Sequence, residues 1–363
     1  MSKDSPSRSA PRRVLHAPHD ANGTAAARAS WRIDVSEAVP HPGRFELAVD
    51  VVVPRERSDE TPPVALVCLP GGFLSRRYFD LELAGDRSYS FAEAMAVQGF
   101  VTLAIDHLGI GESSKPDPID AGFAFGVEVV ARANQLALER ALERLARGDA
   151  EAGIAPTPCG ATIGVGHSMG SVLTVEQQAI ARPHRALVLF SFTTRGLPFF
   201  LNEDQRPYAN DPERARRELG ALARRSYGTP YPPRADGAEG DRRAAFGVGT
   251  APPLAEALLH AASTDLLALG GLLSMIPGGY APSAAVIDVP VYVLIGDHDL
   301  HGERGVREEL PKAPSVTLRT LEDCWHCHLV ANSRAAIWRE IPAWIAEVLA
   351  SDPVGRARRP ASH

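Results

Sequence analysis

The chain has 363 residues and a formal net charge of −6, with 45% hydrophobic and 23% charged side chains. This length predicts one large domain or two ordinary ones, and this composition excludes an intrinsically disordered chain. Because the 44 acidic residues outnumber the 38 basic ones, we expect no nucleic-acid partner. Four cysteines in a chain this long argue against a disulfide framework and favour a cytoplasmic protein.

The N-terminus does not have the pattern of a secretory signal, and an organellar transit peptide is the alternative that its composition allows. Residues 1–30 are polar and lack an apolar core, so we expect a flexible leader there, and residues 351–363 are predicted as a flexible tail. The most apolar stretch, residues 266–276, is well short of the roughly 18 residues that a membrane span requires. We therefore expect no membrane span.

Strand and helix patterns alternate along most of the chain. Two strands are predicted at residues 31–39 and 44–54, joined by a hairpin at residues 41–43. Continuous apolar runs, typical of strands buried on both faces, then alternate with helical patterns. The runs occupy residues 64–70, 101–106, 161–168, 186–192, 289–296 and 316–322, and helices are predicted near 90–98, 121–148, 169–181 and 333–349. This alternation predicts the α/β class, with a mostly parallel sheet covered by helices on both faces.

One long segment, residues 194–285, interrupts this alternation between two predicted strands. It contains no clear strand pattern, but Pro212 begins one helical pattern and residues 255–276 form one or two apolar helices. A segment this long is not a simple connection, so we expect a mainly helical cap subdomain. The predicted core then comprises residues 31–193 and 286–350.

The strongest chemical motif is the pattern G-x-S-x-G at residues 166–170, centred on Ser168. Composition alone would produce this pattern roughly 0.2 times in a chain of this length, so the pattern must be judged by the predicted strand and helix around it. Here the serine ends a predicted strand and opens a predicted helix, which is the setting of a nucleophile elbow. The two glycines leave room for a tight turn, and the free N–H groups of the helix start face a developing negative charge. A serine that merely caps the helix is the alternative.

With the motifs that follow, this elbow makes the predicted core and cap resemble the α/β-hydrolase superfamily, in its serine-nucleophile, esterase- or lipase-like branch with an inserted cap. The sequence LPGGF at residues 69–73 resembles the family's oxyanion loop, although Pro70 stands where a histidine is usual. The resemblance implies that the N–H of Gly72, or of Phe73, binds the oxyanion together with the N–H of Met169. A plain turn built on two glycines is the alternative.

A second family signature follows the next predicted strand. Residues 106–113, DHLGIGES, resemble the family pattern D-x-x-G-x-G-x-S. In the family this segment shapes the turn beside the active site and supplies no member of the catalytic triad. We therefore interpret Asp106 as a structural residue.

A serine hydroxyl is a weak nucleophile and needs a base and an orienting acid, which the family places after the serine in the order acid, then histidine. The acid typically lies three residues past the glycine that ends its strand, so Asp299 is our choice and Asp297 the alternative. His326 lies in the loop after the last predicted strand, where the family places its histidine, and His328 is the alternative. No Asp or Glu follows the predicted strand at residues 186–192, so we do not expect the triad acid in that loop.

The same loop contains CWHCH at residues 324–328, which also matches the C-x-x-C-H pattern of haem attachment. Haem attachment requires export, and a redox C-x-x-C would open a helix in a thioredoxin-like unit, so neither interpretation fits well. A zinc site would need four well-spaced ligands. We therefore expect two free cysteines beside the active-site loop, and neither a cofactor nor a metal.

The resemblance implies a serine hydrolase that cleaves a carboxylic ester or lactone through an acyl-enzyme. The apolar helices of the insertion favour a small-molecule substrate with a bulky apolar part. The same triad suits a thioesterase or a C–C bond hydrolase, and a non-catalytic binding protein on this scaffold is a further alternative. The apolar helix is either a lid over the substrate or the face of a homodimer.

Overall fold

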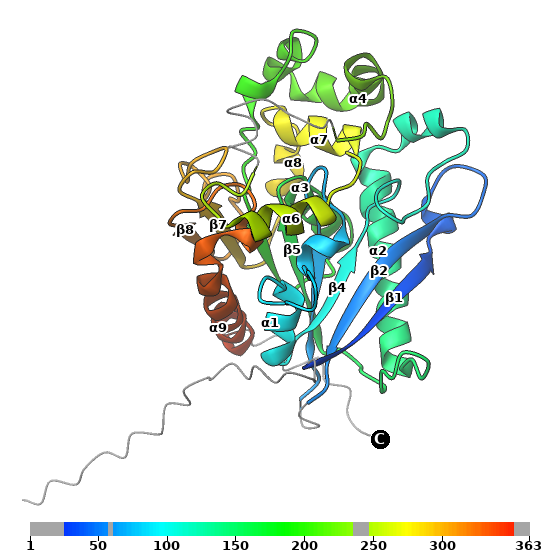
Figure 1. Cartoon of the computed structure of the whole chain (residues 1–363). Helices are drawn as coiled ribbons and strands as arrows, with labels where there is room; N and C mark the ends of the chain where they lie inside the picture. Colours follow the sequence, from blue (N-terminus) through cyan, green and yellow to red (C-terminus); the bar gives the residue numbers. More distant parts are fainter. Residues whose placement is uncertain (1–24, 57–60, 235–246, 352–363) are drawn as a thin grey trace, which may run out of the picture.

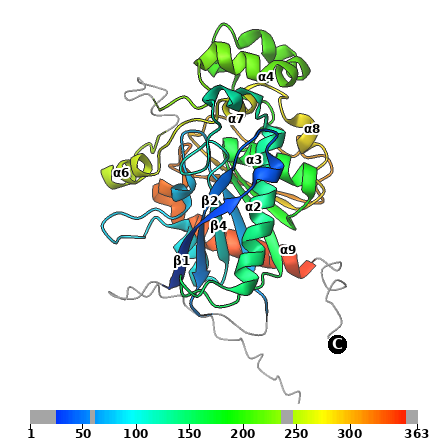
Figure 2. The same ribbon diagram turned by 90° about the vertical axis from the view of Figure 1, so that its right-hand side faces the viewer.

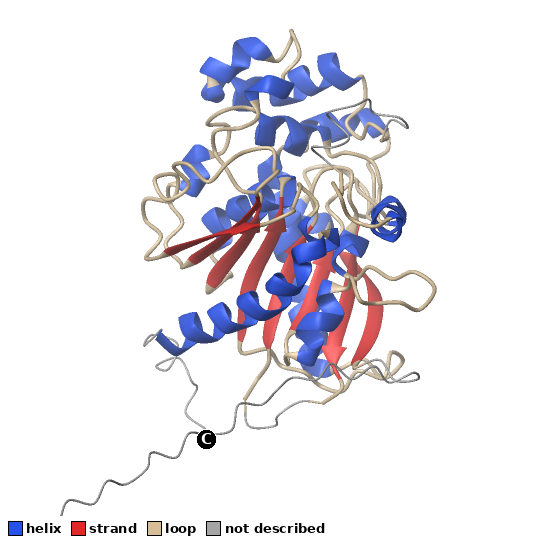
Figure 3. Ribbon diagram, turned by 60° about the vertical axis from the view of Figure 1, so that its left-hand side comes forward, coloured by secondary structure: helices blue, strands red, loops and turns tan. Residues whose placement is uncertain are grey.

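A computed structural model of the chain describes residues 25–56, 61–234 and 247–351 (Figure 1). Within these residues, one sheet is flanked by helices (Figure 3). The strands are β1 (Ala26–Asp34), β2 (Glu46–Pro54), β3 (Val64–Leu69), β4 (Val101–Ile105), β5 (Ala161–His167), β6 (Ala186–Phe190), β7 (Val291–Gly296) and β8 (Val316–Leu321). The α-helices are α1 (Phe91–Val97), α2 (Val127–Arg147), α3 (Met169–Ala181), α4 (Pro212–Tyr227), α6 (Pro253–Ala261), α7 (Ala268–Met275), α8 (Ala281–Ala284) and α9 (Ala335–Ser351).

The sheet has eight strands in the order β1-β2-β4-β3-β5-β6-β7-β8. The strands from β4 to β8 in this order run parallel, while β1 and β2 pair antiparallel with each other and β2 pairs antiparallel with β4. The predicted mostly parallel α/β sheet is therefore confirmed. Because parallel strands end at the same edge, the loops that follow β3, β4, β5, β6, β7 and β8 meet there.

Both faces of the sheet are buried, which explains the continuous apolar runs in the sequence. Successive residues of β3 point to opposite faces: Val67 packs in the core that α2 and α3 cover, whereas Leu66 and Cys68 pack in the core that α1 and α9 cover. Figure 3 shows helices on either side of the strands, and α2 and α9 are labelled in Figure 2.

The chain between β6 and β7 forms α4, α6, α7 and α8, which Figure 1 shows beyond the carboxyl ends of the strands. Helix α4 begins as its sequence predicts, because Asp211 accepts a hydrogen bond from the N–H of Arg214 at 2.9 Å and Pro212 occupies the first turn. It ends at Gly228, which has a positive φ of 70°. Gly270 of α7 lies so close to Met169 that a Cβ would be 3.0 Å from its sulfur.

The predicted end of the leader is wrong. The leader was expected to run to residue 30, but β1 begins at Ala26 and pairs along its whole length with β2. Arg28 anchors this strand through an ion pair of 2.8 Å with Asp80, a partner that the local sequence does not indicate. Residues 1–24 and 352–363, which include most of the predicted leader and tail, lie outside the described residues.

The long helix that was expected from residue 121 starts later. Residues 119–124 form a 3-10 helix, and α2 begins after Gly126, whose ψ of 169° is not helical. Among the described residues, no helix combines the length and the apolar character that crossing a bilayer requires.

Candidate active site

Ser168 lies in the sharp turn between β5 and α3, with φ of 52° and ψ of −120°. A positive φ at a residue other than glycine is strained, and such strain clusters at functional sites. The flanking glycines are required by contact: a Cβ at Gly166 would lie 2.5 Å from the Cα of Ser171, and a Cβ at Gly170 would lie 2.0 Å from the carbonyl oxygen of Leu69. The turn therefore has the geometry predicted for a nucleophile elbow.

Ser168, His326 and Asp299 form a continuous chain of hydrogen bonds. The Nε2 atom of His326 lies 2.8 Å from the Oγ of Ser168, and its Nδ1 lies 2.7 Å from Oδ1 of Asp299. A carboxylate only accepts hydrogen bonds, so the imidazole proton belongs on Nδ1 and Nε2 is free to accept the serine proton. This is the arrangement that activates a serine hydroxyl as a nucleophile.

The Asp299 side chain is completely buried and receives several donors. Besides His326, its Oδ1 accepts hydrogen bonds from the N–H of Leu300 at 2.7 Å and from the hydroxyl of Ser191 at 3.1 Å. Its Oδ2 lies 3.1 Å from Nε2 of His328. Burial opposes the charged form, but the interactions with the two histidines outweigh it and hold the pKa of Asp299 well below its ordinary value. The carboxylate is therefore charged at neutral pH and fixes the orientation of the His326 ring.

The two alternative triad residues occupy different places. Asp297 is part of the turn after β7, where its carboxylate accepts the N–H groups of Asp323 at 3.1 Å and of Cys324 at 3.0 Å. It therefore shapes the loop that carries His326. His328 is completely buried behind Asp299 and stacks on Phe190, with ring centroids 5.8 Å apart. The structure thus brings Asp299 and His326 to the serine, and it places Asp297 and His328 in supporting positions.

Ser191 is a site residue that the sequence did not reveal. It follows β6, it is buried, and it has a positive φ of 56°. Its Oγ lies 3.1 Å from Oδ1 of Asp299, 3.2 Å from Nδ1 of His326 and 3.2 Å from Nε2 of His301. The sequence has no Asp or Glu directly after this strand, so the position offered no candidate acid. No local pattern distinguishes this serine from any other polar residue after a strand.

The loop after β3 lies beside the elbow, as predicted. A hydrogen bond of 3.2 Å from the N–H of Leu74 to the carbonyl of Gly71 closes a turn whose central residues are Gly72 and Phe73. Phe73 has a positive φ of 60°, so this turn is also strained. In the described part of the chain, the N–H groups of Gly72, Phe73 and Met169 donate to no other group. They are therefore available to bind an oxyanion.

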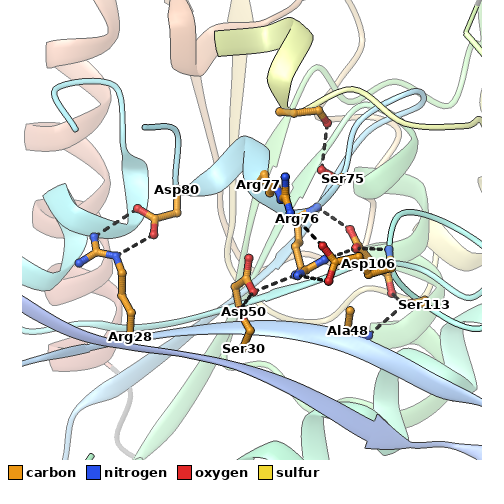
Figure 4. A network of polar contacts seen from close by, with 12 residues as sticks. Arg28, Ser30, Ala48, Asp50, Ser75, Arg76, Arg77, Asp80, Asp106 and Ser113 are labelled. Atoms are coloured by element: carbon orange, nitrogen blue, oxygen red, sulfur yellow. Dashed lines mark hydrogen bonds and ion pairs between the residues drawn. The ribbon is translucent and has the colours of Figure 1, made fainter. Parts of the chain in front are cut away.

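Asp106 belongs to a buried charge cluster behind that loop (Figure 4). Its carboxylate pairs with the guanidinium of Arg76 at 2.5 Å and accepts the N–H of Arg76 at 2.6 Å and of Glu112 at 3.0 Å. A second carboxylate, Asp50, lies 2.9 Å from Nε of Arg76. Gly111 leaves room for this cluster, because a Cβ there would lie 2.2 Å from Oδ2 of Asp106. These contacts agree with a structural role for Asp106 in the D-x-x-G-x-G-x-S turn.

Both cysteines of the CWHCH segment are buried thiols. Burial raises the pKa of the Cys327 thiol to about 12 and raises that of Cys324 further. Because a protonated thiol is a poor nucleophile and a poor metal ligand, neither cysteine has the properties of a reactive site. Within the described residues, no group of three His, Cys, Asp or Glu side chains is arranged to hold a metal ion.

With this geometry established, comparison with known proteins identifies the family. The alpha/beta hydrolase family matches residues 66–354. The chain belongs to this family. No curated protein matches the chain.

Solved structures of this α/β-hydrolase's relatives show the same fold at low sequence identity. A peroxisomal alpha-beta-hydrolase of Saccharomyces cerevisiae is 15% identical with a TM-score of 0.57, and the match covers 94% of each chain. A carboxylesterase structure from Nitrososphaera gargenis is 16% identical with a TM-score of 0.52, and the match covers 86% of this chain and 99% of that one. A putative lipase of Acinetobacter baumannii is 14% identical with a TM-score of 0.51, covering 90% and 93% of the two chains. At these identities the likeness shows the fold alone.

Proposed function

We propose that the protein is a serine hydrolase that cleaves a carboxylic ester or lactone of a fairly apolar substrate. The observation that carries this proposal is the unbroken chain of hydrogen bonds from Ser168 through His326 to Asp299. The strained elbow and the free N–H groups beside it support the same reaction class, because acyl transfer needs both a nucleophile and oxyanion donors.

In the proposed mechanism, the Oγ of Ser168 attacks the carbonyl carbon of the ester while Nε2 of His326 takes its proton. Asp299 stabilises the resulting imidazolium and holds its orientation. The N–H of Met169, with that of Gly72 or Phe73, binds the oxyanion of the tetrahedral intermediate. His326 then protonates the leaving alcohol, and a water molecule that it deprotonates hydrolyses the acyl-enzyme. Every step uses groups of this chain, so the proposal requires no cofactor or metal.

We also propose that the segment between β6 and β7, residues 194–285, acts as a cap that selects the substrate. Two of its residues lie against the proposed oxyanion donors. A Cβ added to Gly72 would lie 2.9 Å from Cδ1 of Leu266, and Gly270 lies against Met169. Apolar side chains beside the proposed oxyanion donors favour an apolar acyl or alcohol group. An acyl-length series tests this proposal. A preference for butyrate or longer chains supports it, and a preference for acetate contradicts it.

The test of the reaction class is hydrolysis of p-nitrophenyl butyrate by the wild type and by Ser168→Ala. Removal of the nucleophile from a serine triad lowers kcat by roughly 10⁶-fold in the best-studied case, so we expect the activity of Ser168→Ala to fall to background. Thioester and activated C–C substrates measured in parallel distinguish the other reactions that suit the same triad. A wild type without hydrolase activity toward any of them would favour a binding protein.

A further inference from the structure

The peptide that joins Pro70 to Gly71 lies between two buried histidines. Strand β3 pairs with β4 on one side and with β5 on the other, and its last paired residue is Leu69. His107 comes two residues after β4, and His167 is the last residue of β5, so the sheet places one imidazole on each side of this peptide. His167 crowds Gly71, where a Cβ would lie 2.6 Å from its Nδ1.

His107 holds the carbonyl oxygen of Pro70. Its Nε2 lies 2.9 Å from that oxygen, and its Nδ1 lies 3.2 Å from Nδ2 of Asn134 on α2. The carbonyl only accepts, so Nε2 carries the proton, and Nδ1 accepts from the Asn134 amide. Burial lowers the pKa of His107 to about 4, so the ring is neutral at physiological pH. Asn134 thus selects the tautomer that donates to Pro70.

The orientation of this peptide sets the start of the oxyanion turn. Gly71 is the first residue of the turn that its own carbonyl closes with the N–H of Leu74. The plane of the preceding peptide fixes the direction in which the following residues leave β3, and with it the direction of the Gly72 and Phe73 N–H groups. A misdirected donor loses much of its value, since oxyanion donors act only when they point at the developing charge.

The far side of the turn has separate restraints from the insertion. The carbonyl of Phe73 accepts the N–H of Thr264 at 2.9 Å, and the N–H of Ser75 donates to the carbonyl of Ala262 at 2.9 Å. The upstream side is held by the His107 bond, just beyond the end of the β3 ladder. Loss of this bond therefore leaves the loop in place and frees one end of it.

We propose that His107 is a positioning residue for the oxyanion hole, because it fixes the Pro70–Gly71 peptide from which the donor turn begins. This inference rests on the proposed serine-hydrolase function. It also accounts for Pro70 in a loop where the family usually has a histidine, since here the loop receives its imidazole contact from His107, which follows β4.

Two substitutions at the same position separate the hydrogen bond from the space that the ring fills. In His107→Leu the donor is lost, and we expect kcat for p-nitrophenyl butyrate to fall ~10- to 100-fold with little change in KM, somewhat less than for removal of a whole oxyanion donor. In His107→Gln an amide N–H returns near the position of Nε2, and we expect most of kcat to return. The thionoester analogue should lose less than about 3-fold in His107→Leu, because sulfur accepts hydrogen bonds weakly and depends less on the hole.

His184 offers a matched control, because it is also a buried histidine with a lowered pKa. It precedes β6, so it lies at the amino-terminal ends of the parallel strands, away from the proposed active site. His184→Leu should retain the wild-type kcat per folded molecule. If His107→Leu does not fold, Asn134→Ala serves instead. It leaves the ring in place but releases its tautomer, and we expect a few-fold loss of kcat for the ester alone.

The inference is overturned if folded His107→Leu, or Asn134→Ala in its place, keeps the wild-type kcat. It is also overturned if His107→Gln loses as much as His107→Leu, or if ester and thionoester fall equally. A failure of the proposed function has a different signature, namely a wild type that neither hydrolyses the ester nor reacts with a fluorophosphonate.

Discussion

Asp299 and Asp106 are both buried aspartates beyond the carboxyl ends of parallel strands, but they have different kinds of partner. Asp299, after β7, faces the imidazoles of His326 and His328, whereas Asp106, after β4, faces the guanidinium of Arg76. An imidazole can gain and lose a proton near neutral pH, and a guanidinium cannot. The first carboxylate is therefore suited to a reaction in which a proton moves, and the second is suited to holding a fixed structure.

The pKa shifts of the two carboxyls run in opposite directions. Burial opposes ionisation of both side chains. For Asp299 the two histidines outweigh burial and lower the pKa, whereas for Asp106 burial outweighs Arg76 and raises it. Similar burial thus does not decide the role of an acid at this edge of the sheet; the partner does. Substitution of each acid and of its neighbours tests this contrast.

Substitution of the acid in the proposed triad should have the largest effect. We expect Asp299→Asn to lower kcat by ~10⁴-fold, as for the equivalent change in a serine protease, because an amide no longer selects the correct histidine tautomer. The measurement is steady-state hydrolysis of p-nitrophenyl butyrate, with thermal unfolding to confirm that the variant folds. Asp297→Asn is the matched control and should stay within about 3-fold of the wild type in kcat. If the two variants exchange effects, Asp297 is the triad acid.

Substitution of the structural acid should act on stability. In Asp106→Asn the buried guanidinium of Arg76 loses its closest counter-charge but keeps Asp50 and Glu112, so we expect the free energy of unfolding to fall by about 1.5–3 kcal/mol, as for a hydrogen bond to a charged group. Urea unfolding measures this loss. The kcat per folded molecule should fall far less than in Asp299→Asn. Unchanged stability, or a comparable loss of kcat, would contradict the division of roles.

The buried histidines without an acidic partner predict how stability depends on pH. Burial lowers the pKa of His107 to about 4 and that of His184 to about 3, from an ordinary value of 6.5. Between pH 6.5 and pH 4 the unfolded chain therefore binds these protons and the folded chain does not, so stability falls as the pH falls, by about 1.4 kcal/mol per pH unit for each ring. His184→Leu should flatten this dependence when unfolding is measured across that range. An unaltered slope would mean that His184 is protonated in the folded state.

The smallest effect should come from the hydroxyl that supports Asp299. Ser191→Ala removes one of the several hydrogen bonds to the charged carboxylate, and because the other donors remain we expect the loss of this bond to cost about 1 kcal/mol. We expect kcat to fall ~5-fold with KM unchanged, as determined from full saturation curves. A loss as large as that of Asp299→Asn would place Ser191 among the reacting groups.

Local patterns at strand ends were sufficient to predict the parallel sheet and the elbow at Ser168. The choice of Asp299 and His326 came from the resemblance to the α/β-hydrolases, and the sequence left Asp297 and His328 as alternatives. It was not sufficient for Ser191 or for the bond from His107 to Pro70, because these contacts join strands that are neighbours only in the folded sheet. The start of β1 at Ala26 was missed for the same reason, since its anchor Asp80 is 52 residues away.

The central claim is that Ser168 is an activated nucleophile, and covalent labelling with a fluorophosphonate followed by peptide mass spectrometry tests it most directly. We expect one adduct per chain, located on Ser168, with labelling strongly slowed in Asp299→Asn and within about 3-fold of the wild-type rate in Asp297→Asn. An unmodified Ser168, or an adduct on another residue, would contradict it.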